Sequence, residues 1–317
     1  MAGLVRALII VLERLPIDSS TALGASIGRA WYALSAPRVR WVRQQLAESL
    51  PDVRIADRER WAREVFVHLG RGLAELIQLQ GRRRGELLDR VSIEGLENLE
   101  TARRQTAAGG VLIVTAHVGN WELAAAKAAH LGLPISVVYR PREGAAIDAA
   151  LLAVRGASNS TLPDGAGAEG IPIDGRAGIR IARALDDGRQ VIVVLDQNAR
   201  RHEGVFVRFF GRLACTRSGP LALASMRGVP VVTAFTHRDP DGRRHHLRID
   251  PALQLEPGAS DDDEVLRRNV QRVADVIEEE IRAFPDQWIW THRRWRTRPA
   301  ENDPRAATDR SGSSHVE

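Results

Sequence analysis

The chain has 317 residues, of which 44% are hydrophobic and 27% are charged. This composition supplies enough apolar material for a sizeable core, and it excludes a wholly disordered chain, a collagen and a coiled coil. The single cysteine, Cys215, excludes a disulfide scaffold and a zinc site built from cysteines. A reducing, cytoplasmic setting is the simplest interpretation of so little cysteine.

The formal net charge is +5, and the 45 basic residues are 44 arginines and Lys127. A GC-rich coding sequence would produce the same bias whatever the protein does. The physical consequence holds in either case, because guanidinium groups bind phosphate and carboxylate bidentately and keep their charge in apolar surroundings. Anionic lipid headgroups, phosphosugars, acidic carrier proteins and nucleic acid are therefore the partner classes to consider.

The amino-terminal segment contains a short uncharged apolar run at residues 7–12, which Arg6, Glu13 and Arg14 bound. A membrane-spanning helix needs about 20 mostly apolar residues, and no segment supplies them. No small-residue cleavage site of a signal peptide follows the run. Two interpretations remain: an amphipathic helix that lies on a membrane with Arg6 and Arg14 near the headgroups, and an ordinary packed helix.

Residues 38–104 are very basic, and their pattern predicts helices throughout. Within this stretch Trp61, Val65, Phe66 and Leu69 recur at helical spacing, which predicts one buried helix face.

From residue 110 the pattern changes to an alternation of strands and helices. Short apolar runs predict strands at residues 110–116, 135–140, 190–196, 204–210 and 229–238, followed by a DPDG turn and a hairpin partner at residues 243–250. Helices are expected at residues 120–132, 144–156, 176–188, 217–228 and 261–284, and a Gly-rich loop at residues 158–172. This alternation predicts an α/β fold with a mixed, largely parallel central sheet flanked by helices.

Three regions follow from these patterns. Residues 1–104 are expected to form a helical, membrane-associating region, and residues 105–299 an α/β core. Residues 300–317 are polar and are expected to be a disordered tail.

The sequence AHVGNWELA carries the first candidate site. His117 leaves a predicted strand, Gly119 and Asn120 turn the chain into a helix, and Glu122 lies in the first helical turn. A carboxylate that accepts the Nδ1 proton would fix the tautomer and leave Nε2 free as a base. The amides of Gly119 and Asn120 lie near a helix amino terminus, where an oxyanion could be stabilised. The alternative is structural: a satisfied polar His117 and a first-turn acid favoured by the helix dipole.

Two other predicted strand ends carry polar residues, and ligands of open α/β sheets gather at such ends. Asp196 and Gln197 follow one strand, although Asp is also routine in turns. Arg140 follows another, and Arg155 lies in the next predicted helix. The alternative for the arginines is a solvated basic face.

Other chemistries find little support. The chain has no G-x-S-x-G elbow, no phosphate-binding GxxxxGK[ST] loop and no HExxH. His237, His245 and His246 fall around the DPDG turn with no acid at ligand spacing, so we expect no metal site. Only 5% of residues are aromatic, which disfavours a nucleic-acid module.

Taken together, these residues resemble the lipid A late acyltransferases, the lauroyl and myristoyl transferases of the lysophospholipid acyltransferase superfamily. The resemblance covers approximately residues 1–299. It rests on blocks that follow in the family's order: AHVGNWELA, VYRP, LDQ, GVFVRFFGRLACTRSG, GVPVVTAF and PDQWIWTHRRWRTRP. The FVRFFGR and QWIWTHRRW segments are the most specific of these.

The resemblance implies a glycerolipid-acyltransferase-like fold and an O-acyltransferase with His117 as general base and Glu122 as its partner. Members carry an arginine after the YRP block, matched here by Arg155, and an acid matched by Asp196, both implicated in the site. The donor would be an acyl carrier protein thioester or acyl-CoA, and the acceptor a Kdo-bearing phosphoglycolipid. The reaction requires neither metal nor other cofactor, and members are integral or peripheral on the cytoplasmic face of the inner membrane.

The chain departs from this family pattern in two places. Many members have a longer apolar amino-terminal segment, which Arg14, Pro16 and Asp18 interrupt here. Peripheral or monotopic attachment is therefore expected. The stretch DGAGAEG, between Arg155 and Asp196, has no counterpart in the pattern.

Alternative functions stay open on the sequence alone. The helix WELAAAKAAH also fits a related group that acylates phosphatidylinositol mannosides. A hydrolase of acyl thioesters or lysolipids could use the same dyad with water. A non-catalytic basic membrane-binding protein could carry the dyad for structural reasons.

The carboxyl-terminal block PDQWIWTHRRWRTRP alternates tryptophans with arginines. One interpretation is that Arg293 and Arg294 hold acceptor phosphates or headgroups while Trp288 lies at the apolar boundary. The other is a packed segment whose tryptophans fill the core and whose arginines face water.

Overall fold

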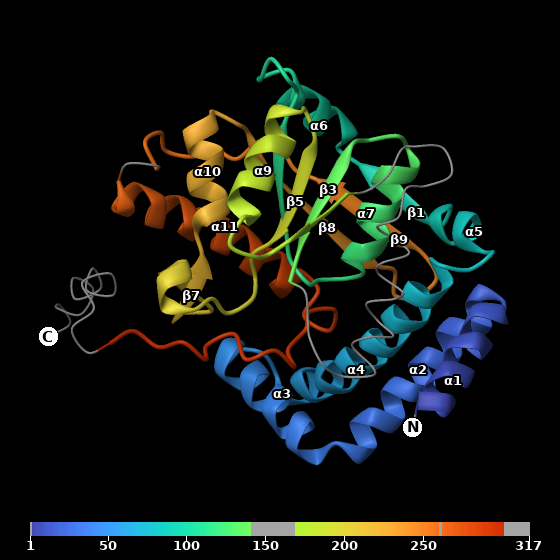
Figure 1. Ribbon diagram of the computed structural model, residues 1–317. Helices are drawn as coiled ribbons and strands as arrows, with labels where there is room; N and C mark the ends of the chain where they lie inside the picture. Colours follow the sequence, from blue (N-terminus) through green and yellow to red (C-terminus); the bar gives the residue numbers. More distant parts are fainter. Residues whose placement is uncertain (1, 141–168, 260–261, 301–317) are drawn as a thin grey trace, which may run out of the picture.

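The computed structural model of the chain describes residues 2–140, 169–259 and 262–300 (Figure 1). The helix expected at residues 144–156, Arg155, most of the Gly-rich loop and nearly all of the predicted tail lie outside the described residues.

A seven-stranded mixed sheet forms the centre, as the alternating pattern predicted. Its order is β1 (Val91–Glu94), β9 (His245–Ile249), β8 (Val231–Arg238), β2 (Val111–Thr115), β5 (Gln190–Val194), β3 (Ile135–Tyr139) and β4 (Glu169–Pro172). The five strands from β8 to β4 run parallel, whereas β9 is antiparallel to β8 and β1 is parallel to β9. The carboxyl ends of β2, β5 and β3 therefore meet at one edge.

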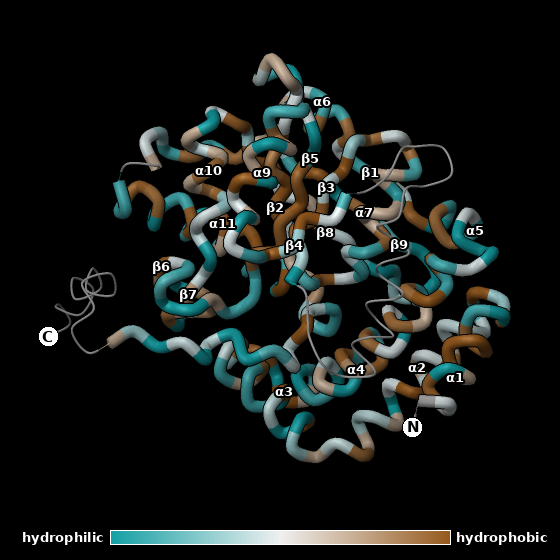
Figure 2. Tube along the Cα trace, in the orientation of Figure 1, coloured by the Kyte–Doolittle hydropathy of each residue, from teal (hydrophilic) through white to brown (hydrophobic). Residues whose placement is uncertain are grey.

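Helices cover both faces of this sheet (Figure 1). They are α5 (Arg84–Leu88), α6 (Leu96–Arg103), α7 (Trp121–His130), α9 (Ala177–Asp186), α10 (Gly219–Arg227) and α11 (Asp263–Ala283). Successive strand residues point to opposite faces, so Leu112 and Val114 pack in the core with α9, α10 and α11. Val111 and Ile113 pack with α6 and α7 on the other face. Every residue of β2 is buried, and Figure 2 shows the hydrophobic strands at the centre.

One predicted strand lies outside the central sheet. Residues 204–210 were expected in it, but among the described residues β6 (Gly204–Phe209) pairs only with β7 (Arg212–Arg217). The two form an antiparallel ribbon preceded by the 3-10 turn η1 (Arg201–Glu203). Phe210 and Gly211 join the strands with φ of 51° and 69°. Positive φ at both turn residues suits the twist of a tight hairpin, so this segment folds back on itself locally.

Two short strands of the central sheet, β1 and β4, were not predicted, and neither was β7 of the ribbon. Residues 91–94 fall inside the stretch expected to be helical, and residues 169–172 inside the expected loop. Each has four residues and pairs with a strand that is distant in the sequence, β1 with β9 and β4 with β3. Such pairing leaves no local periodicity to detect. Residues 91–103, assigned to the amino-terminal region from the sequence, thus form β1 and α6 of the core.

The amino-terminal region is helical: α1 (Ala2–Arg14), α2 (Ile17–Leu34), α3 (Ala36–Ser49) and α4 (Ile55–Gln78), which lie together along one side of the core (Figure 1). Helices α2 and α4 approach closely through glycines, since a Cβ on Gly28 would lie 2.1 Å from the Phe66 carbonyl oxygen. The predicted face of α4 is confirmed, with Val65 and Phe66 buried and Trp61 and Leu69 partly buried. None of the described helices has the length and apolarity needed to cross a membrane.

Candidate active site

His117 and Asp196 meet at the carboxyl edge of the sheet. His117 lies just beyond β2 and Asp196 just beyond β5, and these strands pair in parallel with Thr115 opposite Val194. His117 Nδ1 lies 2.8 Å from Asp196 Oδ1, and the His117 backbone amide donates to Asp196 Oδ2 over 3.1 Å. The acid therefore holds both the ring and the main chain of the histidine.

Asp196 is fully buried and ionised. Trp288 donates its indole Nε1–H to Asp196 Oδ2 over 2.6 Å. Burial alone would raise the pKa of Asp196, but the charge and hydrogen bonds of His117 and the indole of Trp288 lower it from 3.8 to about 2. Because the pKa is lower in the folded protein, the ionised Asp196 stabilises the fold above about pH 4, and this stabilisation is lost as the pH falls toward 2.

When the His117 ring has given up its positive charge, as a general base must, its hydrogen bonds fix the tautomer of the neutral form. An ionised carboxylate can only accept, so Nδ1 carries the proton and donates to Asp196, which leaves Nε2 with a lone pair. The side-chain amide nitrogen of Gln197 lies 3.2 Å from His117 Nε2, in position to donate to that lone pair. The side chain of His117 is 20% exposed, so a substrate can approach the imidazole ring. The arrangement suits a general base.

The sequence analysis expected Glu122 to hold Nδ1 of His117. In the structure Asp196 holds it instead. Glu122 lies partly buried in the first turn of α7, and the ring that α7 places beside His117 is that of Trp121, with centroids 5.6 Å apart. Asp196 reaches Nδ1 because β5 lies parallel to β2 and the two strands end side by side, with Thr115 opposite Val194. A catalytic role for Glu122 stays a prediction.

Gly119 and Asn120 occupy the expected corner, but the Gly119 amide and the Asn120 side chain are bonded within the protein, and a role for the Asn120 amide stays a prediction. The Gly119 amide donates to the Gln287 carbonyl over 3.1 Å, so the expectation that it faces an oxyanion is wrong. Gly119 has φ +59°, and a Cβ there would lie 1.9 Å from the Thr236 carbonyl oxygen, so only glycine fits. The Asn120 side chain is buried: Nδ2 donates to Glu75 over 2.8 Å, and Oδ1 caps α7 through the Leu123 amide.

The predicted phosphate-binding arginines separate into exposed and buried residues. Arg140 follows β3 at the same sheet edge as His117, is half exposed, and has its Nη2 3.8 Å from Glu203 Oε2. Arg293 is exposed and stands 5.7 Å above the ring of Trp41. Both remain predicted headgroup contacts.

The structure contradicts the predicted role of Arg294 as a contact for acceptor phosphates or headgroups. Arg294 is 1% exposed, and burial lowers its pKa to about 10. Its guanidinium donates to the carbonyl oxygens of Gln197 and Cys215, at 3.3 and 2.7 Å, and to Thr216 Oγ1. These acceptors were invisible in the sequence, because β7 was not predicted. Arg294 anchors the segment that carries Gln197 and cannot reach a phosphate in solvent.

The sequence analysis named Trp288 but missed its contact with Asp196. The sequence pattern suggested an apolar boundary or the core, and the side chain is in the core: Trp288 is 1% exposed and Trp290 is 0% exposed. Nothing in the sequence linked Trp288 to Asp196. The isolated bridge between Val118 and Trp288 lays the carboxyl-terminal block beside the His117 corner.

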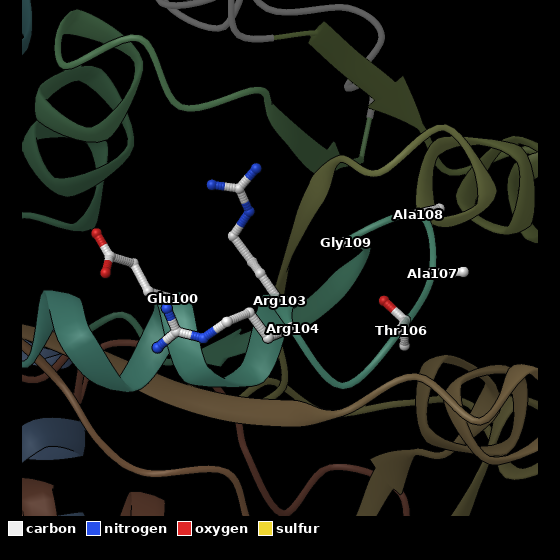
Figure 3. A pocket seen from close by; sticks show the side chains of 7 residues that line it. All are labelled: Glu100, Arg103, Arg104, Thr106, Ala107, Ala108 and Gly109. Atoms are coloured by element: carbon white, nitrogen blue, oxygen red, sulfur yellow. The ribbon is translucent and has the colours of Figure 1, made fainter.

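The described part of the chain holds no group of three or more His, Cys, Asp or Glu side chains arranged to bind a metal. A cavity of about 430 Å³ lies elsewhere, at the loop between α6 and β2 (Figure 3). It is lined by Glu100, Arg103, Arg104, Thr106, Ala107, Ala108 and Gly109. Gly109 precedes β2 and His117 follows it, so this cavity is at the opposite end of the strand.

Known proteins resemble the chain over nearly its whole length. The family model described as bacterial lipid A biosynthesis acyltransferase matches residues 1–297. A lipid A biosynthesis palmitoleoyltransferase of Escherichia coli is 27% identical over 90% of this chain and 88% of its own length. A lauroyltransferase of the same organism is 26% identical over 91% and 89%.

A solved structure was also found, a 1-acyl-sn-glycerophosphate acyltransferase from Thermotoga maritima. It is 17% identical with a TM-score of 0.37, covering 86% of this chain and 99% of that one.

Proposed function

Because the chain belongs to the bacterial lipid A biosynthesis acyltransferase family and is thus an O-acyltransferase, we propose that it moves a fatty acyl chain from a thioester to a hydroxyl of a lipid A-type phosphoglycolipid precursor. The donor is an acyl carrier protein thioester or acyl-CoA. The observation that carries the proposal is the ionised Asp196 that holds the proton on Nδ1 of His117 at the carboxyl edge of the sheet.

In the proposed reaction, Nε2 of His117 removes the proton of the acceptor hydroxyl as its oxygen attacks the thioester carbonyl carbon. The tetrahedral intermediate then collapses, the carbon–sulfur bond breaks, and the thiolate takes the proton from the imidazolium. The positive end of α7 adjoins His117 through Trp121, and its first turn is where we place stabilisation of the oxyanion. Asp196 stabilises the imidazolium while it exists.

The acceptor's phosphates need cations near the same edge. Arg140 follows β3 and is half exposed, which supports a headgroup contact there. Arg293 is a second candidate, from the carboxyl-terminal block. Arg155, which the family resemblance places in the site, lies outside the described residues.

A transfer assay tests the reaction class. The purified protein, acyl-loaded carrier protein and a Kdo-bearing lipid A precursor are expected to give acylated glycolipid by mass spectrometry, with thioester loss at least about tenfold slower when acceptor is omitted. Acyl-CoA in place of the carrier protein identifies the donor. Thioester loss at the same rate with and without acceptor would instead identify a hydrolase, and transfer only to a phosphatidylinositol mannoside would change the acceptor.

We also propose peripheral or monotopic attachment to the cytoplasmic face of the inner membrane. Five of the eight large apolar side chains that are exposed among the described residues lie in the four amino-terminal helices: Ile10, Val11, Trp31, Leu34 and Ile55. Arginines near an anionic surface add about 1 kcal/mol each, screened within about 10 Å at moderate salt.

Vesicle sedimentation tests this attachment. Binding to anionic vesicles is expected to weaken at high salt but not to vanish, because the apolar contacts persist. Changing Ile10 and Val11 together to serine should lower the retained fraction, whereas serine at Ile179 and Met226, which are exposed on α9 and α10, should not. Retention through salt and alkaline carbonate, with release only by detergent, would show an integral anchor.

A further inference from the structure

A buried group of charged side chains adjoins the corner that carries His117. Its centre is Glu75, near the end of α4, which is 2% exposed. Arg238, at the end of β8, donates to both carboxylate oxygens, with its Nη2 2.7 Å from Glu75 Oε2. His245, the first residue of β9, has its Nε2 3.0 Å from Glu75 Oε1. Three elements distant in sequence therefore converge on one carboxylate.

This carboxylate is ionised. Burial alone would raise the pKa of Glu75, but the Arg238 guanidinium and the hydrogen bonds from Arg238 and His245 hold it well below its usual range. An ion pair inside a protein is costly to desolvate, and apolar side chains of the same volume are often at least as stable. A contribution to stability is thus a weak explanation for the Glu75–Arg238 pair. The residues that the pair holds in place indicate its role better.

The group holds the catalytic corner through Asn120. Asn120 Nδ2 donates to Glu75 Oε2 over 2.8 Å, while the Oδ1 of the same side chain accepts from the Leu123 amide and caps α7. One side chain thereby joins the buried ion pair to the first turn of α7, three residues after His117.

Both peptide groups of Gly119 are held by residues attached to the Glu75–Arg238 pair, through Gln287 beside Arg238 and His68 on the helix of Glu75. Gln287 is fixed by two bonds to the Arg238 main chain, of 2.7 and 2.9 Å, and its carbonyl accepts from the Gly119 amide. His68 lies two turns before Glu75 on α4, and its Nε2 is 3.0 Å from the Gly119 carbonyl oxygen. Burial and Arg238 lower the pKa of His68 to about 3, so the ring is neutral and donates its Nε2–H.

We propose that Asn120, held by the Glu75–Arg238 ion pair, is a positioning residue for His117. It fixes the Gly119 peptide and the first turn of α7 relative to the His117–Asp196 pair, so α4 of the amino-terminal region takes part in catalysis through this contact. The inference rests on the proposed role of His117 as the base. Because its side chain is buried and bonded within the protein, Asn120 acts through the histidine rather than on a substrate.

The substitution Asn120→Ser separates positioning from capping. Serine is a good amino-terminal cap and can still accept from the Leu123 amide, but it is too short to reach Glu75. We expect kcat for acyl transfer to fall about 10- to 100-fold with both KM values within about twofold, because small misplacements of reacting groups cost this much. Rates are measured well below the melting transition of each variant.

The matched control is Asp262→Ser. Asp262 caps α11 by accepting from the Glu264 and Val265 amides, so this variant changes a cap without touching the Glu75 group. Its kcat should stay within twofold of wild type. An Asn120→Ser protein that only melts earlier, with wild-type kcat at low temperature, would reduce Asn120 to a structural cap and overturn the proposal.

Combining Asn120→Ser with His117→Ala tests whether Asn120 acts through the histidine. If it does, Asn120→Ser should lower the residual activity of His117→Ala by no more than about twofold, since effects of residues that act as a unit are not additive. A further loss as large as in the wild-type background would overturn the inference. Wild-type activity in His117→Ala would instead refute the proposed base, whatever Asn120 does.

The solvent exchange of the His117 Nδ1 proton provides a test that does not depend on turnover. In protein with ¹⁵N-labelled histidine, the proton that His117 Nδ1 donates to Asp196 should exchange faster with solvent in Asn120→Ser than in wild type or Asp262→Ser. If the exchange rate of this proton and kcat are both unchanged in Asn120→Ser, Asn120 has no positioning role.

Discussion

Replacing His117 by alanine is expected to lower kcat for acyl transfer by at least about 10²-fold, the low end for a positioned general base. The loss should be in kcat rather than KM, because Nε2 acts on the hydroxyl proton in the transition state and contributes little to ground-state binding. Turnover is measured with saturating donor and acceptor, alongside thermal melts.

The fold should survive this change. Asp196 keeps the indole of Trp288 and the backbone amide of residue 117 as donors, at 2.6 and 3.1 Å in the wild type, so its charge is not left without hydrogen bonds. His130→Ala is the matched control, since His130 is exposed at the opposite end of α7 and its loss should leave kcat within twofold. Transfer within tenfold of wild type in a folded His117→Ala protein would refute the base.

What the sequence could predict here was local. His117, Gly119 and Asn120 lie within a few residues of one another, so local residue preferences suffice to place a strand end, a turn and a helix start on them. Asp196 was recognised as an acid at a strand end, but its partner was not, because the pairing depends on β5 lying next to β2. The family resemblance named Glu122 as partner, five residues away along the chain.

Contacts between distant segments account for most other differences. Arg294 looked like a surface cation among alternating arginines and tryptophans, yet it is buried because carbonyl acceptors from β7 and the Gln197 segment surround it. The Glu75 group combines α4, β8 and β9, and no spacing in the sequence relates a helix residue to strand residues 163 and 170 positions away. Hydrophobic periodicity predicted the buried faces, whereas buried polar partners required the folded chain.

The Asp196→Asn variant is expected to show the largest loss of activity of any single isosteric change, about 10³- to 10⁴-fold in kcat, by analogy with buried acids that orient a catalytic histidine. The two donors on Asp196 Oδ2, the Trp288 indole and the His117 amide, would place the asparagine oxygen at that position. Its NH₂ group would then face His117 Nδ1. Because NH₂ can only donate there, Nδ1 must accept, and the proton moves to Nε2, where it blocks the base.

Two measurements and one comparison test this prediction. ¹⁵N NMR of labelled histidine should show the Nδ1–H tautomer in wild type and the Nε2–H tautomer in Asp196→Asn, with similar melting temperatures. Glu122→Gln is the matched comparison: we expect it to keep the wild-type tautomer, even if its activity falls. If Glu122→Gln changes the tautomer while Asp196→Asn retains the wild-type one and transfers acyl groups within tenfold of wild type, the carboxylate that orients His117 during turnover is Glu122. The pairing of His117 with Asp196 would then be a resting arrangement that the bound substrates rearrange.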